Sequence, residues 1–219
     1  MMIAGLVLAA GSSTRMGSVN KLLQPIDAQA MISAVLTALL ESSVDSLWVV
    51  TGFESDKVAS LLEKLSHDYG LKAGNKIHGI ENLDYSQGLS TSLKSGIQAL
   101  PDCVEAVMIV QADMPMLTAA HLERLLAIYK KTNHKLTSQH KKIIAPFYQQ
   151  QRGNPIIFPR RFFNSLQTIS GDQGARQLLK QWAEHIVAVE MTDDAVLFDV
   201  DTPAQLQAAR MALGAVDEQ

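Results

Sequence analysis

The residues best suited to chemistry begin in a polar loop directly after the first apolar run of the chain. Residues 10–21 combine hydroxyl side chains with two glycines, Gly11 and Gly17, and two cations, Arg15 and Lys21. Glycines let the backbone N–H groups of such a loop approach an anion, and the cations can neutralise it. The loop therefore predicts a site for a nucleotide triphosphate, although it has neither the P-loop nor the Gly-x-Gly-x-x-Gly spacing. An ordinary turn with solvated cations is the alternative interpretation.

Carboxylates follow apolar runs at two later points. Asp113 closes one run just before Met114 and Pro115, so its side chain should point from the edge of a sheet into a crevice. Asp199 and Asp201 lie two residues apart, and on a strand they would share a face. The alternative for Asp113 is a turn-capping role before the proline, and for the later pair it is capping of the last helix.

The apolar pattern predicts the elements that must position these residues. Continuous apolar runs predict buried strands at 3–10, 47–50 and 107–110, with a shorter strand near 76–80. Apolar residues at helical spacing predict helices within 32–40, 58–65, 89–100 and 122–129. This alternation is typical of an α/β fold, with a three-layer, Rossmann-like, mostly parallel sheet and helices on both faces. Ligands bind beyond the carboxyl ends of such strands, which here means after Ala10, near Asn82 and after Val110.

The second half of the chain has a less regular pattern. The lysine-rich segment 130–142 lacks apolar periodicity and is interpreted as a mobile surface excursion. Residues 143–158 are strand-like with a break at 152–155, and helical signals return at 162–166 and 177–182. A last short strand is predicted at 197–201. Thr202 and Pro203 then provide an N-cap and a first-turn proline for a final helix.

Composition narrows the class of protein. The chain has 219 residues, of which 47% are hydrophobic and 19% charged, as expected for a globular enzyme-sized domain. A net charge of −3 predicts neither a nucleic acid nor an anionic membrane as a partner. Cys103 is the only cysteine, which excludes an internal disulfide and a Cys-based zinc cage and fits a cytoplasmic location. The apolar start ends at Gly11, well short of the roughly 20 residues that a membrane span needs.

Several motifs together resemble a known family. The opening motif Leu8-Ala9-Ala10-Gly11-x-Ser13-x-Arg15-Met16-Gly17, followed by Lys21, resembles the signature of nucleotidyltransferases with a GT-A-like fold. Matching segments are Asn82-x-x-Tyr85-Ser86-Gln87-Gly88-x-Ser90-Thr91-Ser92, Ala112-Asp113-Met114-Pro115, Arg152-Gly153-Asn154-Pro155, Gly171-Asp172-x-Gly174-Ala175-Arg176 and Asp199-x-Asp201-Thr202-Pro203. With them the chain most resembles the molybdenum cofactor cytidylyltransferases, which are MobA-like proteins. The likeness runs from about Leu6 to Leu206.

The resemblance implies a reaction in which CMP passes from CTP to molybdopterin and pyrophosphate is released, with Mg²⁺ as cofactor. It implies catalytic roles for Arg15, Lys21 and Asp113, and metal binding by Asp113 and Asp201, which we favour over Asp199. The implied nucleotide contacts are Leu8, Ala9, Ala10, Gly11, Ser12, Ser13, Asn82, Gly88, Ser92 and Asp113. The implied acceptor contacts are Arg152, Gly153, Asn154, Asp172 and Arg176. One domain, 1–219, would then hold a nucleotide-binding part at about 1–118 and an acceptor-binding part at about 119–219.

Other interpretations stay open. Ala9 and Ala10 in place of two glycines narrow the room for a purine and resemble the CTP-using branch, whereas the three residues between Gly17 and Lys21 are commoner in guanylyltransferases, so GTP is an alternative. A sugar-phosphate nucleotidyltransferase fits the opening motif alone. A non-catalytic cofactor-binding chaperone for a molybdoenzyme would keep the same fold, and a recipient molybdoenzyme is a further candidate partner. For 88–92 the alternative is an N-cap cluster, and for 152–155 and 172–176 it is a structural turn.

Overall fold

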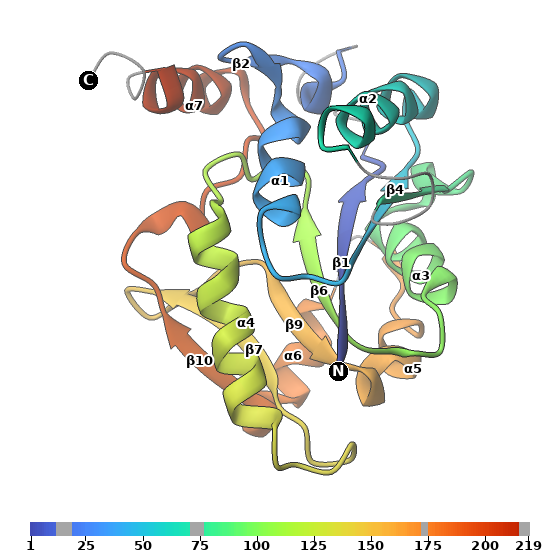
Figure 1. Cartoon of the computed structure of the whole chain (residues 1–219), viewed down its shortest axis with the longest axis vertical. Coiled ribbons are helices and arrows are strands. Elements are labelled where there is room, and N and C mark those ends of the chain that lie inside the picture. The colour runs from blue at the N-terminus through green and yellow to red at the C-terminus, as the bar shows by residue number, and fades with distance from the viewer. Residues whose placement is uncertain (12–18, 71–76, 172–174, 215–219) are drawn as a thin grey trace.

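One mixed sheet with helices on both faces organises the chain (Figure 1). The computed structural model describes residues 1–11, 19–70, 77–171 and 175–214. The strand order is β10-β7-β9-β6-β1-β4-β5, and the short β8 pairs with β7. Both halves of the sequence thus contribute strands to the same sheet, which is the α/β architecture that the periodicity predicts.

Four parallel strands form one half of the sheet. They are β1 (Met2–Ala9), β4 (Ser46–Thr51), β5 (Ile77–Glu81) and β6 (Val104–Gln111). In register, Leu8 pairs with Gln111 and with Val50. The carboxyl ends of these strands therefore meet at one edge of the sheet, where ligands bind in open α/β sheets. The predicted strands at 3–10, 47–50, 76–80 and 107–110 are confirmed to within a few residues.

The other half of the sheet is mixed. It contains β7 (Ile143–Tyr148), β8 (Gln151–Arg152), β9 (Ile156–Pro159) and β10 (Ile186–Glu190). Strand β9 runs antiparallel to both β6 and β7, while β10 runs parallel to β7. A separate small hairpin joins β2 (Pro25–Ile26) to β3 (Gln29–Ala30).

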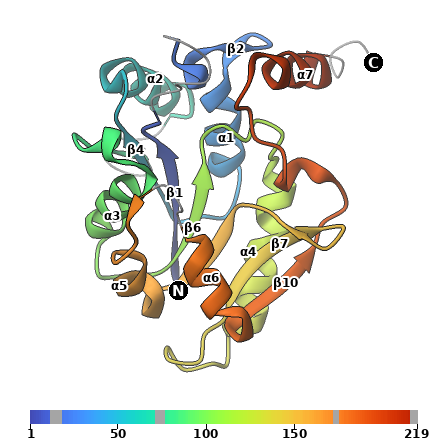
Figure 2. The same ribbon diagram turned by 180° about the vertical axis from the view of Figure 1, so that it is seen from behind.

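Helices cover the two faces in separate layers. On one face lie α1 (Met31–Leu40), α2 (Ser55–Asp68) and α4 (Ala119–Asn133), and on the other α3 (Leu89–Ala99), α5 (Phe163–Leu166) and α6 (Arg176–Gln181) (Figure 2). Helix α7 (Pro203–Gly214) packs beside β2 at the top of Figure 1. No helix among the described residues combines the length and the apolar character needed to cross a membrane.

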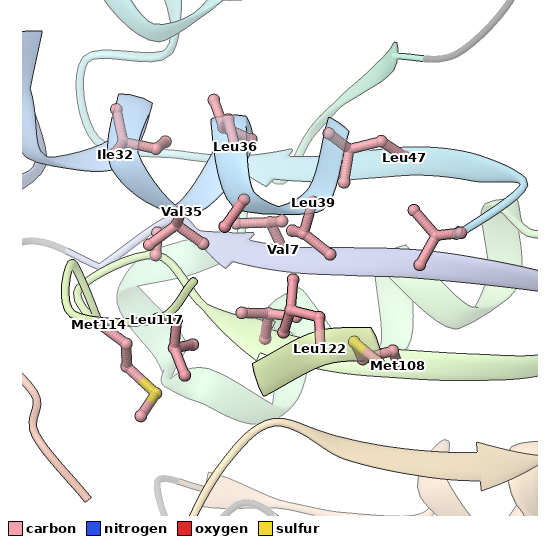
Figure 3. Close-up of a cluster of buried hydrophobic side chains, with 14 of the residues drawn as sticks. Val7, Ile32, Val35, Leu36, Leu39, Leu47, Met108, Met114, Leu117 and Leu122 are labelled. Carbon is pink, nitrogen blue, oxygen red and sulfur yellow. The ribbon is translucent and has the colours of Figure 1, made fainter. Parts of the chain in front are cut away.

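The core explains why β1 shows no alternation in its sequence. Val7 faces the layer with α1, where Figure 3 shows it among Val35, Leu36 and Leu39, whereas Leu6 faces the layer with α3. Both faces of the strand are buried against helices, so apolar residues are favoured at every position. Burial on both sides holds β1 rigidly at the centre of the sheet, with its carboxyl end at the predicted ligand edge.

Two expectations for the second half are wrong. Residues 197–201 form no strand, because Val200 donates its backbone N–H to the carbonyl of Asp113 instead of joining a ladder. Residues 130–133 belong to α4, and Asn133 ties down the loop that follows by donating to the carbonyl of Lys142 at 3.1 Å and accepting from its N–H at 2.6 Å. The surface excursion is therefore limited to 134–142. The final helix does begin at Pro203, and Thr202 Oγ1 accepts from the N–H of Gln205 at 3.3 Å.

Candidate active site

Lys21 is placed by the residue before it. Asn20 is almost fully buried, and its side chain accepts from the N–H of Leu22 at 3.1 Å and donates to the carbonyl of Phe53 at 3.1 Å. These bonds cap the short 3₁₀ helix η2 (Lys21–Leu23) and anchor it to the loop after β4. These contacts fix the C-terminal end of the polar loop predicted from the sequence. The backbone of Lys21, and with it the start of its side chain, is therefore held in place.

The ammonium group of Lys21 bridges two distant aspartates. Its Nζ lies 2.7 Å from Asp113 Oδ2 and 2.7 Å from Asp201 Oδ1. The side chain of Lys21 is only 12% exposed, against 18% for Asp113 and 32% for Asp201. Burial alone would lower the pKa of Lys21, but the charges and hydrogen bonds of Asp113 and Asp201 outweigh it, so the pKa is raised above its usual range. The lysine is therefore held as a cation.

The two carboxylate segments are joined through their backbones as well. Asp113 follows β6, and its carbonyl accepts from the N–H of Val200 at 2.9 Å. On the far side, Gln205 Oε1 accepts from the N–H of Asp201 at 3.0 Å, which ties Asp201 to the start of α7. Residues 113 and 201 are consequently brought together by contacts that do not depend on Lys21 alone.

Asp199 completes a cluster of three carboxylates. One oxygen from each of Asp113, Asp199 and Asp201 lies within 4.8 Å of the others, and all three residues are half-buried. Burial raises the pKa of Asp199, and the neighbouring charges of Asp113 and Asp201 raise it further. Among the described residues, the ammonium of Lys21 faces these three crowded carboxylates, and a bound divalent cation would relieve the repulsion between them.

The donor set fits a hard divalent cation. Among the described residues, Asp113 Oδ1 is buried and has no hydrogen-bond partner. Such an unpaired buried oxygen is costly unless something binds it. Mg²⁺ takes oxygen ligands and is usually held by one or two carboxylates together with substrate phosphates. Asp113 with Asp199 or Asp201 therefore suits Mg²⁺, and metal binding by Asp113 and Asp201 stays a prediction.

The predicted nucleotide-loop residues are only partly open to a ligand. Ala9 and Ala10 are 1% and 3% exposed, with their methyl groups in the two core layers, and Leu8 is half-buried. Gly11 is exposed, and a Cβ built there would meet nothing within 4 Å. Ser12, Ser13 and Arg15 lie outside the described residues, so their roles remain predictions.

The Asn82 motif is engaged in holding its own turn. Asn82 is 3% exposed, and its Nδ2 donates to Thr91 Oγ1 at 2.9 Å and to Ser92 Oγ at 3.0 Å. Its Oδ1 accepts from the N–H of Asp84 at 3.1 Å. These bonds brace the loop between β5 and α3, for which Gly88 is the N-cap at φ 111°. The structure thus gives Asn82 and Ser92 a bracing role, and direct contact of Asn82, Gly88 or Ser92 with a nucleotide remains a prediction.

The predicted acceptor residues are spread between two places. Gly153 and Asn154 pack against the short 3₁₀ helix η7 (Asp194–Val196), with the Asn154 N–H donating to the carbonyl of Val196 at 2.9 Å. Arg152 is half-buried in β8. Asp172 and the side chain of Arg176 lie outside the description, so contact of these five residues with an acceptor remains a prediction.

Sequence reasoning missed two residues that shape the site. Asn20 was passed over, although a polar residue directly before the loop lysine could have marked it as a cap. Gly52 follows β4, and a Cβ there would lie 2.6 Å from Tyr85 Cβ and 2.9 Å from Ala10 Cβ. Glycine is required because three segments of the ligand edge converge on this point, which shows only in three dimensions.

Comparison with known proteins finds relatives that share much of this chain. The chain is 32% identical over 216 residues to the purine catabolism protein PucB of Bacillus subtilis, covering 96% of this chain and 97% of PucB. It is also 31% identical over 136 residues to the bifunctional protein GlmU of Mycolicibacterium paratuberculosis, covering 61% of this chain but only 27% of GlmU. Among solved structures, the Mycobacterium sp. strain JC1 homologue of rv0371c is similar at 25% identity and a TM-score of 0.77, with 98% of each chain covered.

A family model identifies the fold and the class of activity. The model for the MobA-like NTP transferase domain matches residues 5–187, which include the first loop, Asp113 and the turn at 152–155. The match spans most of the chain, and the cluster of Lys21 with the carboxylates lies at the carboxyl edge of the parallel strands, where ligands bind in open α/β sheets. The chain therefore belongs to the MobA-like NTP transferase family and is a nucleotidyltransferase with a GT-A-like fold.

Proposed function

We propose that the protein transfers CMP from CTP to molybdopterin, releases pyrophosphate and requires Mg²⁺. The observation that carries the proposal is the meeting of Lys21 with Asp113 and Asp201 at 2.7 Å each, beside Asp199, at the carboxyl ends of the parallel strands. A buried cation beside a carboxylate cluster is suited to a substrate that brings both phosphates and a divalent ion. The motif combination described above favours molybdopterin over other acceptors.

In the proposed reaction a terminal phosphate oxygen of the acceptor attacks the α-phosphorus of the nucleotide in line. A new P–O bond forms there as the bond to the oxygen bridging the α- and β-phosphorus breaks, and that oxygen leaves with the pyrophosphate. Lys21 turns its ammonium toward the α-phosphate and stabilises the charge that builds up on it. Arg15 is assigned to the triphosphate. Asp113 and Asp201 would hold Mg²⁺, which supplies charge neutralisation at the phosphate oxygens when bound.

The preference for CTP comes from Ala9 and Ala10 standing in place of two glycines. The methyl groups of Ala9 and Ala10 lie in the core, so any effect on base size would act through the position of the Ala10-Gly11 peptide and through Gly52 beside it. GTP stays the alternative nucleotide. The full-length relative PucB is named for purine catabolism, and we accordingly propose a molybdoenzyme that acts on a purine as the recipient of the product.

A pyrophosphate-release assay tests the proposal. The purified protein is given CTP, GTP or ATP, with molybdopterin or a sugar 1-phosphate as acceptor, with and without Mg²⁺. We expect release only with CTP, molybdopterin and Mg²⁺ together. Preference for GTP would change the nucleotide assignment, and turnover with a sugar phosphate alone would change the acceptor. Stoichiometric binding of molybdopterin with no turnover under any combination of substrates would instead support the function of a cofactor-binding chaperone.

A further inference from the structure

The turn between β8 and β9 docks on the chain segment that carries two of the carboxylates. Gly153 is buried, and its N–H donates to the carbonyl of Pro146 at 2.9 Å. The next N–H, that of Asn154, donates to the carbonyl of Val196 at 2.9 Å. A Cβ at position 153 would lie 2.2 Å from that carbonyl oxygen and 2.8 Å from its carbon. The backbone of Gly153 does not have a positive φ, so glycine is required here by space and not by conformation.

A second attachment holds the same segment from the α4 side. His121 Nδ1 accepts from the N–H of Thr118 at 3.1 Å, so the ring hydrogen lies on Nε2, which is 3.0 Å from Asp193 Oδ2. The other carboxylate oxygen of Asp193 accepts from the N–H of Ala195 at 3.0 Å and caps η7. The start of α4, a few residues after Asp113, is thereby tied to the start of η7.

These attachments flank a short path to the metal-binding carboxylates. The chain runs from Val196 to Asp199 and Asp201, and between these carboxylates Val200 donates its backbone N–H to the carbonyl of Asp113 at 2.9 Å. Each residue of an extended chain advances about 3.3–3.6 Å, whereas the three carboxylate oxygens lie within 4.8 Å of one another. A slip of a single residue would therefore disperse the cluster.

We propose that Gly153 is a positioning residue for the metal-dependent transfer. The missing side chain lets the turn after β8 seat on the Val196 carbonyl, which fixes where Asp199 and Asp201 stand relative to Asp113, and His121 fixes the same segment through Asp193. Gly153 thus serves the metal side of the site through backbone contacts, in addition to any contact with the acceptor. This inference rests on the proposed Mg²⁺-dependent function, but it concerns metal geometry and not the identity of the substrates.

The test measures Mn²⁺ binding to the nucleotide-free protein by electron paramagnetic resonance, since Mn²⁺ uses the same oxygen ligands as Mg²⁺. Gly153→Ala should weaken Mn²⁺ binding roughly tenfold or more, the size found when groups that orient metal ligands are lost. The half-saturating Mg²⁺ concentration for pyrophosphate release should rise in parallel, while the KM for nucleotide at saturating Mg²⁺ changes less than about threefold. His121→Ala should act in the same direction through the other attachment.

Two controls separate positioning from a general loss of stability. Gly79→Ala in β5, where the nearest atom to a new Cβ is 3.8 Å away, should leave Mn²⁺ binding unchanged. Leu166→Ala removes a fully buried side chain from the opposite core layer, and it should lower Tm without altering Mn²⁺ affinity.

If folded Gly153→Ala binds Mn²⁺ with an affinity within twofold of wild type, the proposal is overturned. If Gly153→Ala does not fold, an affinity within twofold of wild type in His121→Ala overturns it. Weakening in Leu166→Ala equal to that in Gly153→Ala would also overturn it. A wild-type protein that binds Mn²⁺ but never releases pyrophosphate would refute only the proposed function.

Discussion

Replacing Lys21 by methionine removes one charge from the centre of the site and keeps most of the side-chain volume. In the structure the ammonium makes two 2.7 Å hydrogen bonds to carboxylates and is 12% exposed. Its loss leaves Asp113, Asp199 and Asp201 together without that cation. We therefore expect Lys21→Met to lower both the stability of the metal-free protein and its turnover.

The expected loss of stability follows from the exposure of the two partners. A hydrogen bond to a charged group contributes about 1.5–3 kcal/mol when it is well shielded. Asp113 is 18% exposed and Asp201 is 32% exposed, so solvent screens the second bond more strongly. We expect the free energy of unfolding to fall by roughly 2–3 kcal/mol in EDTA. Mg²⁺ at ten times its Kd should restore about 1.4 kcal/mol by mass action, because it binds the folded cluster.

Turnover should fall further than stability explains. If Lys21 stabilises charge in the transition state, its removal should lower kcat by roughly 10²–10³-fold, the effect of losing one preorganised donor. The assays are urea unfolding with EDTA or Mg²⁺, and pyrophosphate release at saturating substrates. Lys57→Met is the matched control, since Lys57 is 65% exposed and pairs with Glu54, three residues earlier in the chain. Turnover of Lys21→Met within threefold of wild type, or unfolding indistinguishable from Lys57→Met, would refute the reasoning.

Three further predictions concern the surroundings of the site. Gly52→Ala should raise the KM for nucleotide and lower the free energy of unfolding by about 1–3 kcal/mol, because the new Cβ would lie 2.6 Å from Tyr85 Cβ. Nucleotide titration measures the first effect and thermal unfolding the second, and an unchanged Tm contradicts the prediction. Asn82→Ala should cost about 1–3 kcal/mol because it removes the bonds to the buried Ser92 hydroxyl and to the Asp84 N–H; urea unfolding measures the loss, and an unchanged free energy of unfolding contradicts it. The hydrogen bond from His121, assisted by the Ala195 N–H and opposed by partial burial, lowers the pKa of Asp193 below its ordinary 3.8. An acid with a depressed folded pKa stabilises the fold above its unfolded pKa, so the stability advantage of wild type over Asp193→Asn should hold at neutral pH and disappear as pH falls from about 4; an advantage that persists at pH 2 contradicts this.

The sequence by itself determined the elements whose side-chain patterns are local. The unbroken apolar run of β1 predicted a strand buried on both faces, and apolar residues at helical spacing predicted α1 and α4. Asp113, just after β6, and the polar loop that follows β1 and leads to Lys21 could then be placed at one edge of the sheet, because parallel strands end together. These inferences held because burial on a sheet or helix imposes a period on the residues of a single segment.

Elements that depend on a partner could not be derived in this way. Strand β10 has a mixed burial pattern and exists because β7 pairs with it. The apolar run at 197–201 has strand-like composition, but Val200 bonds to the Asp113 carbonyl, so no ladder forms. In both cases the backbone partner decides the conformation, and that partner is distant in sequence.

The arrangement of Lys21 with the three carboxylates depends on the tertiary structure. Lys21 and Asp201 meet across a separation of 180 residues, and no local period reports such a contact. The fit of Gly153 against Val196 depends equally on two segments that approach only when the sheet is complete. The residue types indicated which chemistry is possible. Contacts between distant segments at the edge of the sheet determined which charged side chains lie in the same site.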